Sequence, residues 1–265
     1  MMPLTIEGTA EVNWTATGPA SAMLLVRAAV ADEATLLDEE LLAEGAAVEE
    51  GPVRGDGARP VRIHAAAEGP VRLRYRAAVE VDPRGREAVD DGRMLPDSGA
   101  LPFDLLGWTL PSRYAPSDVL APTAEAVWGD APRTRALLPA VAGWVRERIA
   151  YIPGASDALT AADETLLRRQ GVCRDMAHLA VALLRALEVP ARVVACYAPL
   201  LDPPDFHALV EAHDGEAWRL MDATGLAPVA SVVRIATGRD AADVAWATGS
   251  AALTLDDVRV GAERA

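Results

Sequence analysis

Cys173 is the residue in this chain whose type and position most directly suggest chemistry. It lies at the start of an apolar segment, Val172 to Leu187, which Gly171 precedes and Pro190 follows. Because the segment is apolar on nearly every side, it predicts a helix that is buried within a domain. In the first turn of a helix, unpaired backbone N–H groups and the helix dipole favour a negative charge. The thiolate of Cys173 would be stabilised there, and the thiolate is the nucleophilic form of cysteine.

A histidine and an aspartate further along the chain could assist such a nucleophile. The dipeptide Asp214-Gly215 separates two β-capable segments, which predicts a hairpin with these two residues as its loop. In that register His207 faces Asp222 directly, and the Cβ atoms of such a cross-strand pair lie about 4.5–5.5 Å apart. A carboxylate at this distance can hold an imidazole in one tautomer and orientation. Cys173, His207 and Asp222 therefore form a candidate set of nucleophile, base and orienting group.

Each of these residues also has a structural interpretation. A lone free cysteine is most often a small buried hydrophobe, and a histidine beside an aspartate can be a satisfied core residue. The presence of all three residue types in one chain favours catalysis. The same three side chains could hold a zinc ion with a water as the fourth ligand, but the short ligand pairs typical of zinc sites are missing. An acidic loop of the calcium-binding type is also missing, so we expect no metal and no cofactor.

The motifs around these residues resemble those of the bacterial transglutaminase-like family, which belongs to the papain-like superfamily of cysteine enzymes. The resemblance covers about residues 110–250. It rests on Gly171-Val172-Cys173-Arg174-Asp175, on Phe206-His207-Ala208 and on Asp222-Ala223-Thr224. Leu209 and Ala223 stand where many members of the family have Trp and Pro, which bears on substrate preference.

The resemblance implies a cysteine peptidase, amidase or acyltransferase with Cys173, His207 and Asp222 as its catalytic triad. Cys173 would attack an amide of a protein or peptide, and an acyl-thioester would then pass to water or to an amine. The backbone N–H of Cys173 could stabilise the oxyanion, with Tyr151 or Gln170 as a second donor. The alternative is a catalytically inactive protein of the same fold that serves as a binding module. The sequence leaves hydrolysis and transamidation both open, as well as the oligomeric state.

Three other side chains near these motifs are expected to have supporting roles. His178 lies five residues from Cys173 and so points to a different side of the helix, which favours a structural role. Asp175 is expected to stabilise the start of the helix or to bind Arg174 or the backbone. His213, at the tip of the hairpin, is expected to be solvated.

Composition excludes several classes of partner. The chain has 265 residues and a formal net charge of −14, which argues against binding to nucleic acid or to an anionic membrane surface. No apolar run is long enough to span a membrane, and the first residues do not resemble a secretory signal, so we expect a cytoplasmic location. The two cysteines do not suggest a disulfide scaffold, and Cys196 is assigned to packing in a buried strand.

The remaining pattern predicts an α+β protein in two parts. Residues 1–110 are expected to form an antiparallel β-sandwich-like domain that ends in a proline-rich connector, and residues 111–265 a transglutaminase-like domain. In the second domain the helix that starts at Cys173 packs on an antiparallel sheet. The expected strands are 23–30, 60–65, 70–81, 191–198, 206–213 and 217–222, and the further expected helices are 133–151 and 160–169.

Overall fold

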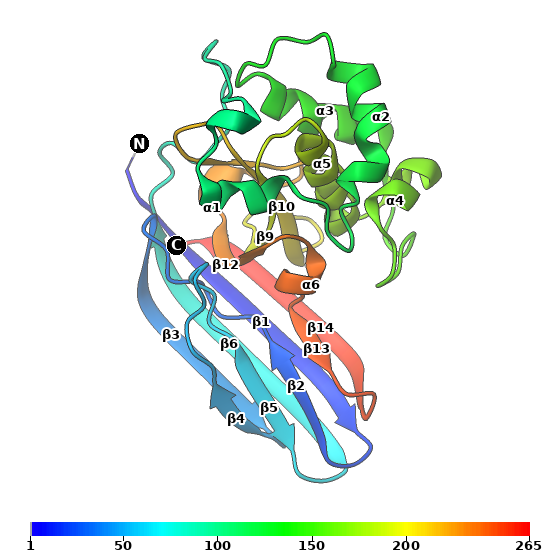
Figure 1. Cartoon of the computed structure of the whole chain (residues 1–265). Coiled ribbons are helices and arrows are strands. Elements are labelled where there is room, and N and C mark those ends of the chain that lie inside the picture. Colours follow the sequence, from blue (N-terminus) through cyan, green and yellow to red (C-terminus); the bar gives the residue numbers. More distant parts are fainter. Residues whose placement is uncertain (1) are drawn as a thin grey trace.

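The computed structural model describes residues 2–265 and has a β region at one end and a helical region at the other (Figure 1). The strands are β1 (Leu4–Ala16), β2 (Ala20–Leu24), β3 (Ala34–Glu44), β4 (Ala47–Glu50), β5 (Val61–Ala65), β6 (Gly69–Val81), β7 (Ala150–Tyr151), β8 (Gln170–Gly171), β9 (Ala191–Tyr197), β10 (Phe206–His213), β11 (Trp218–Met221), β12 (Val233–Gly238), β13 (Ala247–Gly249) and β14 (Leu253–Arg264). The α-helices are α1 (Phe103–Leu106), α2 (Ser117–Trp128), α3 (Leu137–Arg148), α4 (Ala162–Arg168), α5 (Cys173–Ala186) and α6 (Ala241–Val244).

The β region consists of two four-stranded antiparallel sheets, with strand orders β14-β1-β6-β3 and β13-β2-β5-β4. Alternate residues of β6 are buried, as the period-two pattern predicts, and they share one core with β2 and β5. This confirms the predicted antiparallel β region. Both ends of the chain contribute to it, because β14 pairs along β1 and β13 pairs with β2. A domain boundary at residue 110 stays a prediction, and residues 247–264 belong to the sheets of the N-terminal region.

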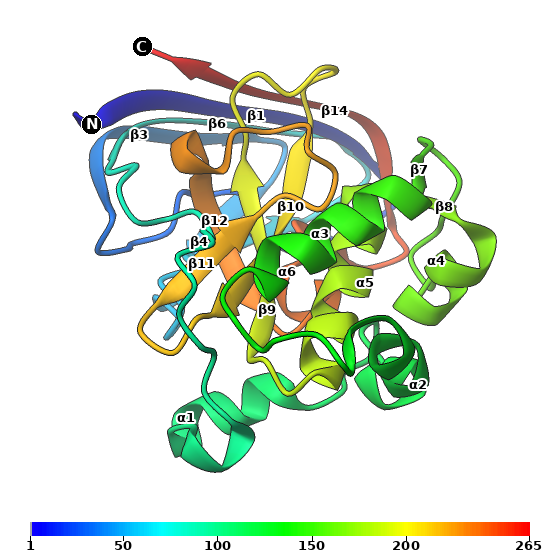
Figure 2. The same cartoon turned by 90° about the horizontal axis from the view of Figure 1, so that it is seen from above.

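A third antiparallel sheet, with strand order β11-β10-β9-β12, carries the helical region. α5 begins at Cys173, as predicted, and packs on the face of this sheet that presents Val193 and Val210. Helices α2, α3 and α4 surround α5 beside the sheet (Figure 2). α5 therefore has protein on every side. His178 and Arg185, which share one side of the helix, are buried and bind backbone groups instead of facing water. The α+β class is confirmed.

Two predicted elements differ from the observed ones. The apolar run 23–30 forms a strand only as far as Leu24. Beyond it the chain is buried between the β region and the third sheet, where Ala29 N–H donates to the carbonyl of Arg234. The helix predicted over 160–169 begins only at Ala162, and the Thr160 hydroxyl before it donates to Asp157 at 3.2 Å. Burial alone therefore does not distinguish a strand from an extended packed segment.

Tyr197 of β9 joins the β region to the third sheet. Its side chain is fully buried, its hydroxyl donates to the carbonyl of Val26 at 2.5 Å, and its ring stacks on Tyr75 with 6.1 Å between centroids. Gly8 of β1 faces the same ring, and a Cβ at that position would lie 3.1 Å from it. A side chain at residue 8 would therefore push the Tyr197 ring aside by a few tenths of an ångström.

We expect Tyr197→Ala to lower the free energy of unfolding by about 3–5 kcal/mol, because it leaves a large cavity where the two regions meet. Tyr197→Phe removes only the hydroxyl and should cost about 1–2 kcal/mol, since the Val26 carbonyl loses its partner. Urea denaturation followed by circular dichroism measures both. Leu36→Ala, at a residue that is 41 % exposed, is the control. A Tyr197→Ala protein as stable as this control would contradict the joining role.

Candidate active site

Cys173 occupies the first turn of α5, and Asp175 holds that turn in place. The Asp175 carboxylate is fully buried and accepts hydrogen bonds from the backbone N–H of Val172 at 2.9 Å and from Ser156. It also accepts from Arg174 at 2.7 Å. Both roles expected for Asp175, at the helix start and with Arg174, are thus observed. The half-buried thiol of Cys173 therefore projects from a rigid helix terminus.

The short parallel pair β7–β8 brings Tyr151 beside the cysteine. Tyr151 pairs with Gly171, and the backbone N–H of Ile152 donates to the carbonyl of Gly171 at 2.9 Å. The phenol of Tyr151 lies near enough to the backbone N–H and the thiol of Cys173 for both to affect its pKa. Burial, followed by the negative charges of Cys173 and Asp205, raises the pKa of Tyr151 to about 12. Tyr151, one of the two candidate oxyanion donors, therefore lies beside Cys173.

His207 lies at the start of β10, and its side chain is fully buried. Its Nε2 atom is 3.1 Å from Oδ2 of Asp222. Nδ1 has no hydrogen-bond partner within residues 2–265, and the Cys173 thiol lies near enough to the ring to raise its pKa. Burial lowers the pKa of His207, yet the interactions with Asp222 and Cys173 outweigh it and raise the pKa to about 10. The structure thus brings together the three side chains that the sequence singled out.

Asp222 is held by the chain that follows it. Its Oδ1 accepts from the N–H of Thr224 at 2.8 Å and from the Thr224 hydroxyl at 2.7 Å, and its Oδ2 accepts from the N–H of Ala227 at 2.9 Å. Burial raises the pKa of Asp222, but these bonds and His207 lower it to about 2. The carboxylate therefore stays ionised and cannot rotate away from the imidazole.

The predicted hairpin register is wrong by two residues. His213 pairs with Trp218 and Glu211 with Leu220, so the loop has four residues, 214–217, rather than two. Asp222 lies one residue beyond β11 and is not the cross-strand partner of His207. A shift of two residues leaves each side chain on the same face of the sheet, because the side-chain period of a strand is two. His207 and Asp222 therefore still meet.

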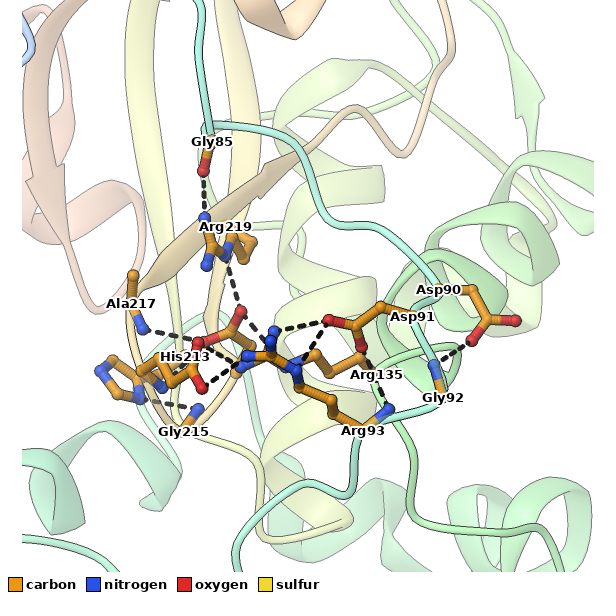
Figure 3. A network of polar contacts seen from close by, with 12 residues as sticks. Gly85, Asp90, Asp91, Gly92, Arg93, Arg135, His213, Gly215, Ala217 and Arg219 are labelled. Atoms are coloured by element: carbon orange, nitrogen blue, oxygen red, sulfur yellow. Dashed lines mark hydrogen bonds and ion pairs between the residues drawn. The ribbon is translucent and has the colours of Figure 1, made fainter.

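The side chain of Asp214 explains the longer loop. Its Oδ1 accepts from the N–H groups of Glu216 and Ala217, both at 2.8 Å, and its Oδ2 accepts from Arg219 at 2.6 Å. The buried Arg135 lies 2.9 Å from both Asp91 and Glu216, which attaches the turn to the connector after β6 (Figure 3). An aspartate that caps its own turn in this way overrides the two-residue loop that Asp-Gly usually forms.

Two other histidines lie away from Cys173. His178 is fully buried, stacks on Tyr114 at 5.3 Å, and accepts from the N–H of Ala241 at 3.0 Å. Burial lowers its pKa to about 4, so it is a neutral structural residue, as expected. His213 is half-buried rather than solvated, because its ring packs edge-on against Trp218 at 5.3 Å.

Metal ligands do not gather at this site or elsewhere in the part of the chain that the structure describes. Among residues 2–265, no three His, Cys, Asp or Glu side chains are placed so that they could hold a metal ion. Within the same residues, no helix combines the length and the apolar character needed to cross a bilayer.

Asp214→Ala should lower the free energy of unfolding by about 3–5 kcal/mol, because the N–H groups of Glu216 and Ala217 lose their acceptor and Arg219 loses its buried carboxylate. Glu216→Ala, at a side chain that is 57 % exposed, should cost less than about 1 kcal/mol. Thermal unfolding of both variants tests this difference. Equal effects would show that Asp214 does not hold the turn.

The pKa of His207 should fall in Asp222→Asn, because an amide supplies no negative charge. In the native chain the pKa is raised from 6.5 to about 10. The protonated ring therefore stabilises the fold fully below pH 6.5, and this contribution is lost as the pH rises through about 10. NMR titration of the ring protons measures the shift, with Asp202→Asn in an exposed loop as the control. An unchanged pKa in Asp222→Asn would contradict the pairing.

Comparison with known proteins gives the family context of this geometry. Residues 122–223 match the family model of the transglutaminase-like superfamily. The chain is similar to a crystal structure of a candidate cysteine protease from Cytophaga hutchinsonii, with 32 % identity and a TM-score of 0.91 over 100 % of this chain and 91 % of that one.

Two mycobacterial proteins without an assigned function are also similar. One from Mycobacterium leprae is 30 % identical over 119 residues, which are 42 % of this chain and 43 % of that protein. One from Mycobacterium tuberculosis is 37 % identical over 68 residues, which are 26 % of this chain and 22 % of that protein. The chain thus spans less than half the length of either relative. The matched segment holds α5, β10 and Asp222, and together with the full-length structural similarity it shows that the chain belongs to the transglutaminase-like superfamily.

Proposed function

We propose that this protein is a cysteine enzyme that cleaves or transfers an amide of a protein or peptide, with Cys173, His207 and Asp222 as its triad. One observation carries the proposal: the buried imidazole of His207 lies between the Asp222 carboxylate, at 3.1 Å, and the thiol of Cys173. This is the order of nucleophile, base and orienting group that thiol catalysis needs. The membership of the transglutaminase-like superfamily and the similarity to the Cytophaga hutchinsonii protein support it.

The charge of His207 is set before substrate binds. A pKa of about 10 means that His207 is protonated at neutral pH. Asp222, with its pKa of about 2, balances the positive ring. In the proposed reaction the attacking sulfur of Cys173 therefore has an imidazolium as its neighbour, and this imidazolium is a ready proton donor.

Each step of the reaction uses these groups. The sulfur of Cys173 attacks the amide carbonyl and forms a C–S bond. The C–N bond then breaks, and His207 gives its proton to the leaving amine. Water or a second amine attacks the thioester while His207 accepts its proton, and the thiolate leaves. Asp222 keeps the ring oriented and charge-balanced throughout.

We propose two donors for the oxyanion. One is the backbone N–H of Cys173, and the other is the phenol of Tyr151, which lies beside that residue. Its pKa of about 12 keeps the phenol protonated and able to donate. In the reaction the phenol turns its O–H toward the substrate oxygen.

Transfer to an amine is the second candidate reaction. The carboxylate of Asp205 lies near enough to His207 and Tyr151 to affect both charges. A carboxylate at this position would attract a cationic amine such as a lysine side chain. The similarity to a candidate cysteine protease supports hydrolysis instead.

Reaction with iodoacetamide tests the nucleophile. We expect fast alkylation of Cys173 and slow alkylation of Cys196, which is fully buried and whose pKa burial raises strongly. His207→Ala should slow the reaction at Cys173 by about 10²-fold or more, since the ring stabilises the thiolate. Mass spectrometry locates the label. A sluggish Cys173 that does not respond to His207→Ala would instead indicate an inactive binding module.

Incubation with a glutamine-containing peptide, with and without a primary amine, tests the reaction type. Deamidated or cleaved peptide indicates hydrolysis, and amine-linked peptide indicates transfer. Asp222→Asn should lower either rate by about 10²–10⁴-fold, because the imidazole loses its orientation. Asp205→Asn should lower transfer to a cationic amine more than it lowers hydrolysis. Equal product from Cys173→Ala would refute the proposed nucleophile.

A further inference from the structure

A polar pocket lies on the face of the third sheet that is opposite α5. Its volume is about 580 Å³, within the usual range for a small-molecule site. Arg192, Glu211 and Leu220, from β9, β10 and β11, pair across the strands and form its floor. Loops 30–33, 53–57 and 84–86 form its walls. Cys173 and His207 do not line it, so it is separate from the candidate active site.

A buried ion cluster occupies the floor of this pocket. Arg234 lies 2.7 Å from Glu211 and 3.0 Å from Glu33, and Arg192 lies 2.7 Å from the same Glu211. Arg192 also stacks over the ring of Trp218 at 3.8 Å. Arg234 and Glu211 are each less than one-tenth exposed. These charges are therefore screened little by water.

Arg86 is the member of this cluster that makes no hydrogen bond to a carboxylate among the described residues. It is 6 % exposed, and its Nη1 atom donates to the backbone carbonyls of Ala230 and Val232. The nearest carboxylate oxygen, on Glu33, is 3.9 Å from Nη2 and already accepts from Arg234. The Nε atom of Arg86 is buried without a hydrogen-bond partner among the described residues.

The cluster has one more guanidinium group than it has carboxylates, and so a net charge of +1. Three guanidinium groups, those of Arg86, Arg192 and Arg234, face the two carboxylates of Glu33 and Glu211. At the rim, Arg54 is paired with Asp56 at 3.1 Å and Arg84 with Asp82 at 2.6 Å, while Asp32 is exposed to water. Burial and the neighbouring Arg234 lower the pKa of Arg86, as expected for a cation without full compensation. A buried charge of this kind is costly unless an anion pairs with it.

We propose that this pocket binds a small organic anion with one carboxylate group, whose oxygens pair with Arg86. A single excess charge matches a monocarboxylate better than a dianion such as phosphate, because Glu33 and Glu211 would repel a second negative charge. The planar guanidinium suits a carboxylate. Leu220 of the floor and the neighbouring Trp218 supply an apolar surface for the body of the ligand.

Calorimetric titration of the full chain with benzoate, at constant ionic strength, tests the proposal. We expect saturable binding of one benzoate per chain, at least about tenfold tighter than binding of benzamide, which has the same shape without the charge. Arg86→Gln should weaken benzoate by about tenfold or more. Glu33→Gln should tighten it, because a competing carboxylate is lost. Arg76→Gln, at an exposed arginine of β6 paired with Asp38, is the matched control and should change nothing.

Several results would overturn the proposal. These are no saturable benzoate binding, equal affinity for benzamide, tighter binding of inorganic phosphate than of benzoate, or Arg86→Gln with native affinity. A gain of affinity in Glu33→Gln cannot come from misfolding, so this variant keeps the test decisive if Arg86→Gln is unstable. Cys173→Ala should bind benzoate as the native chain does, which separates this pocket from the proposed catalysis.

Discussion

The site depends on a buried pair of opposite charges, His207 and Asp222. Neither side chain could stay ionised alone at this depth, because removing a single charge from water is costly. Together they are stable because Thr224 and Ala227 supply further hydrogen bonds to the carboxylate. The pair in turn keeps a positive charge next to Cys173 at neutral pH. The reactivity that we propose for the thiol follows from that charge.

Much of the remaining structure keeps this pair and the thiol in place. The buried α5 fixes the sulfur from one side through Asp175, and β10 fixes the imidazole from the other. The turn at residues 214–217, which the Asp214 side chain holds, fixes the register of β11 against β10 and thereby the position of Asp222. Tyr197 anchors β9 to the β region, so the sheet that carries His207 shares one core with that region. A rigid support of this kind is what positions catalytic groups to within a fraction of an ångström.

The β region and the third sheet together also create the polar pocket. Loops between the N-terminal strands close over Glu211 of β10 and Arg234 of β12. Glu211 is four residues from His207 along β10, so both side chains lie on the same face of that strand. This arrangement gives the N-terminal strands a role beyond support, because they supply Glu33 and the walls of the pocket.

The sequence by itself determined the local features: the start of α5 at Cys173, the alternation of β6, and the residue types of the candidate triad. These follow from side-chain periodicity and helix-end chemistry, which act over a few residues. The tertiary structure alone decided the hairpin register, the extended path of residues 25–30 and the return of β13 and β14 to the N-terminal sheets. Those features depend on contacts between residues far apart in the chain, such as Arg135 with Asp214 and Ala29 with Arg234, which no local pattern encodes.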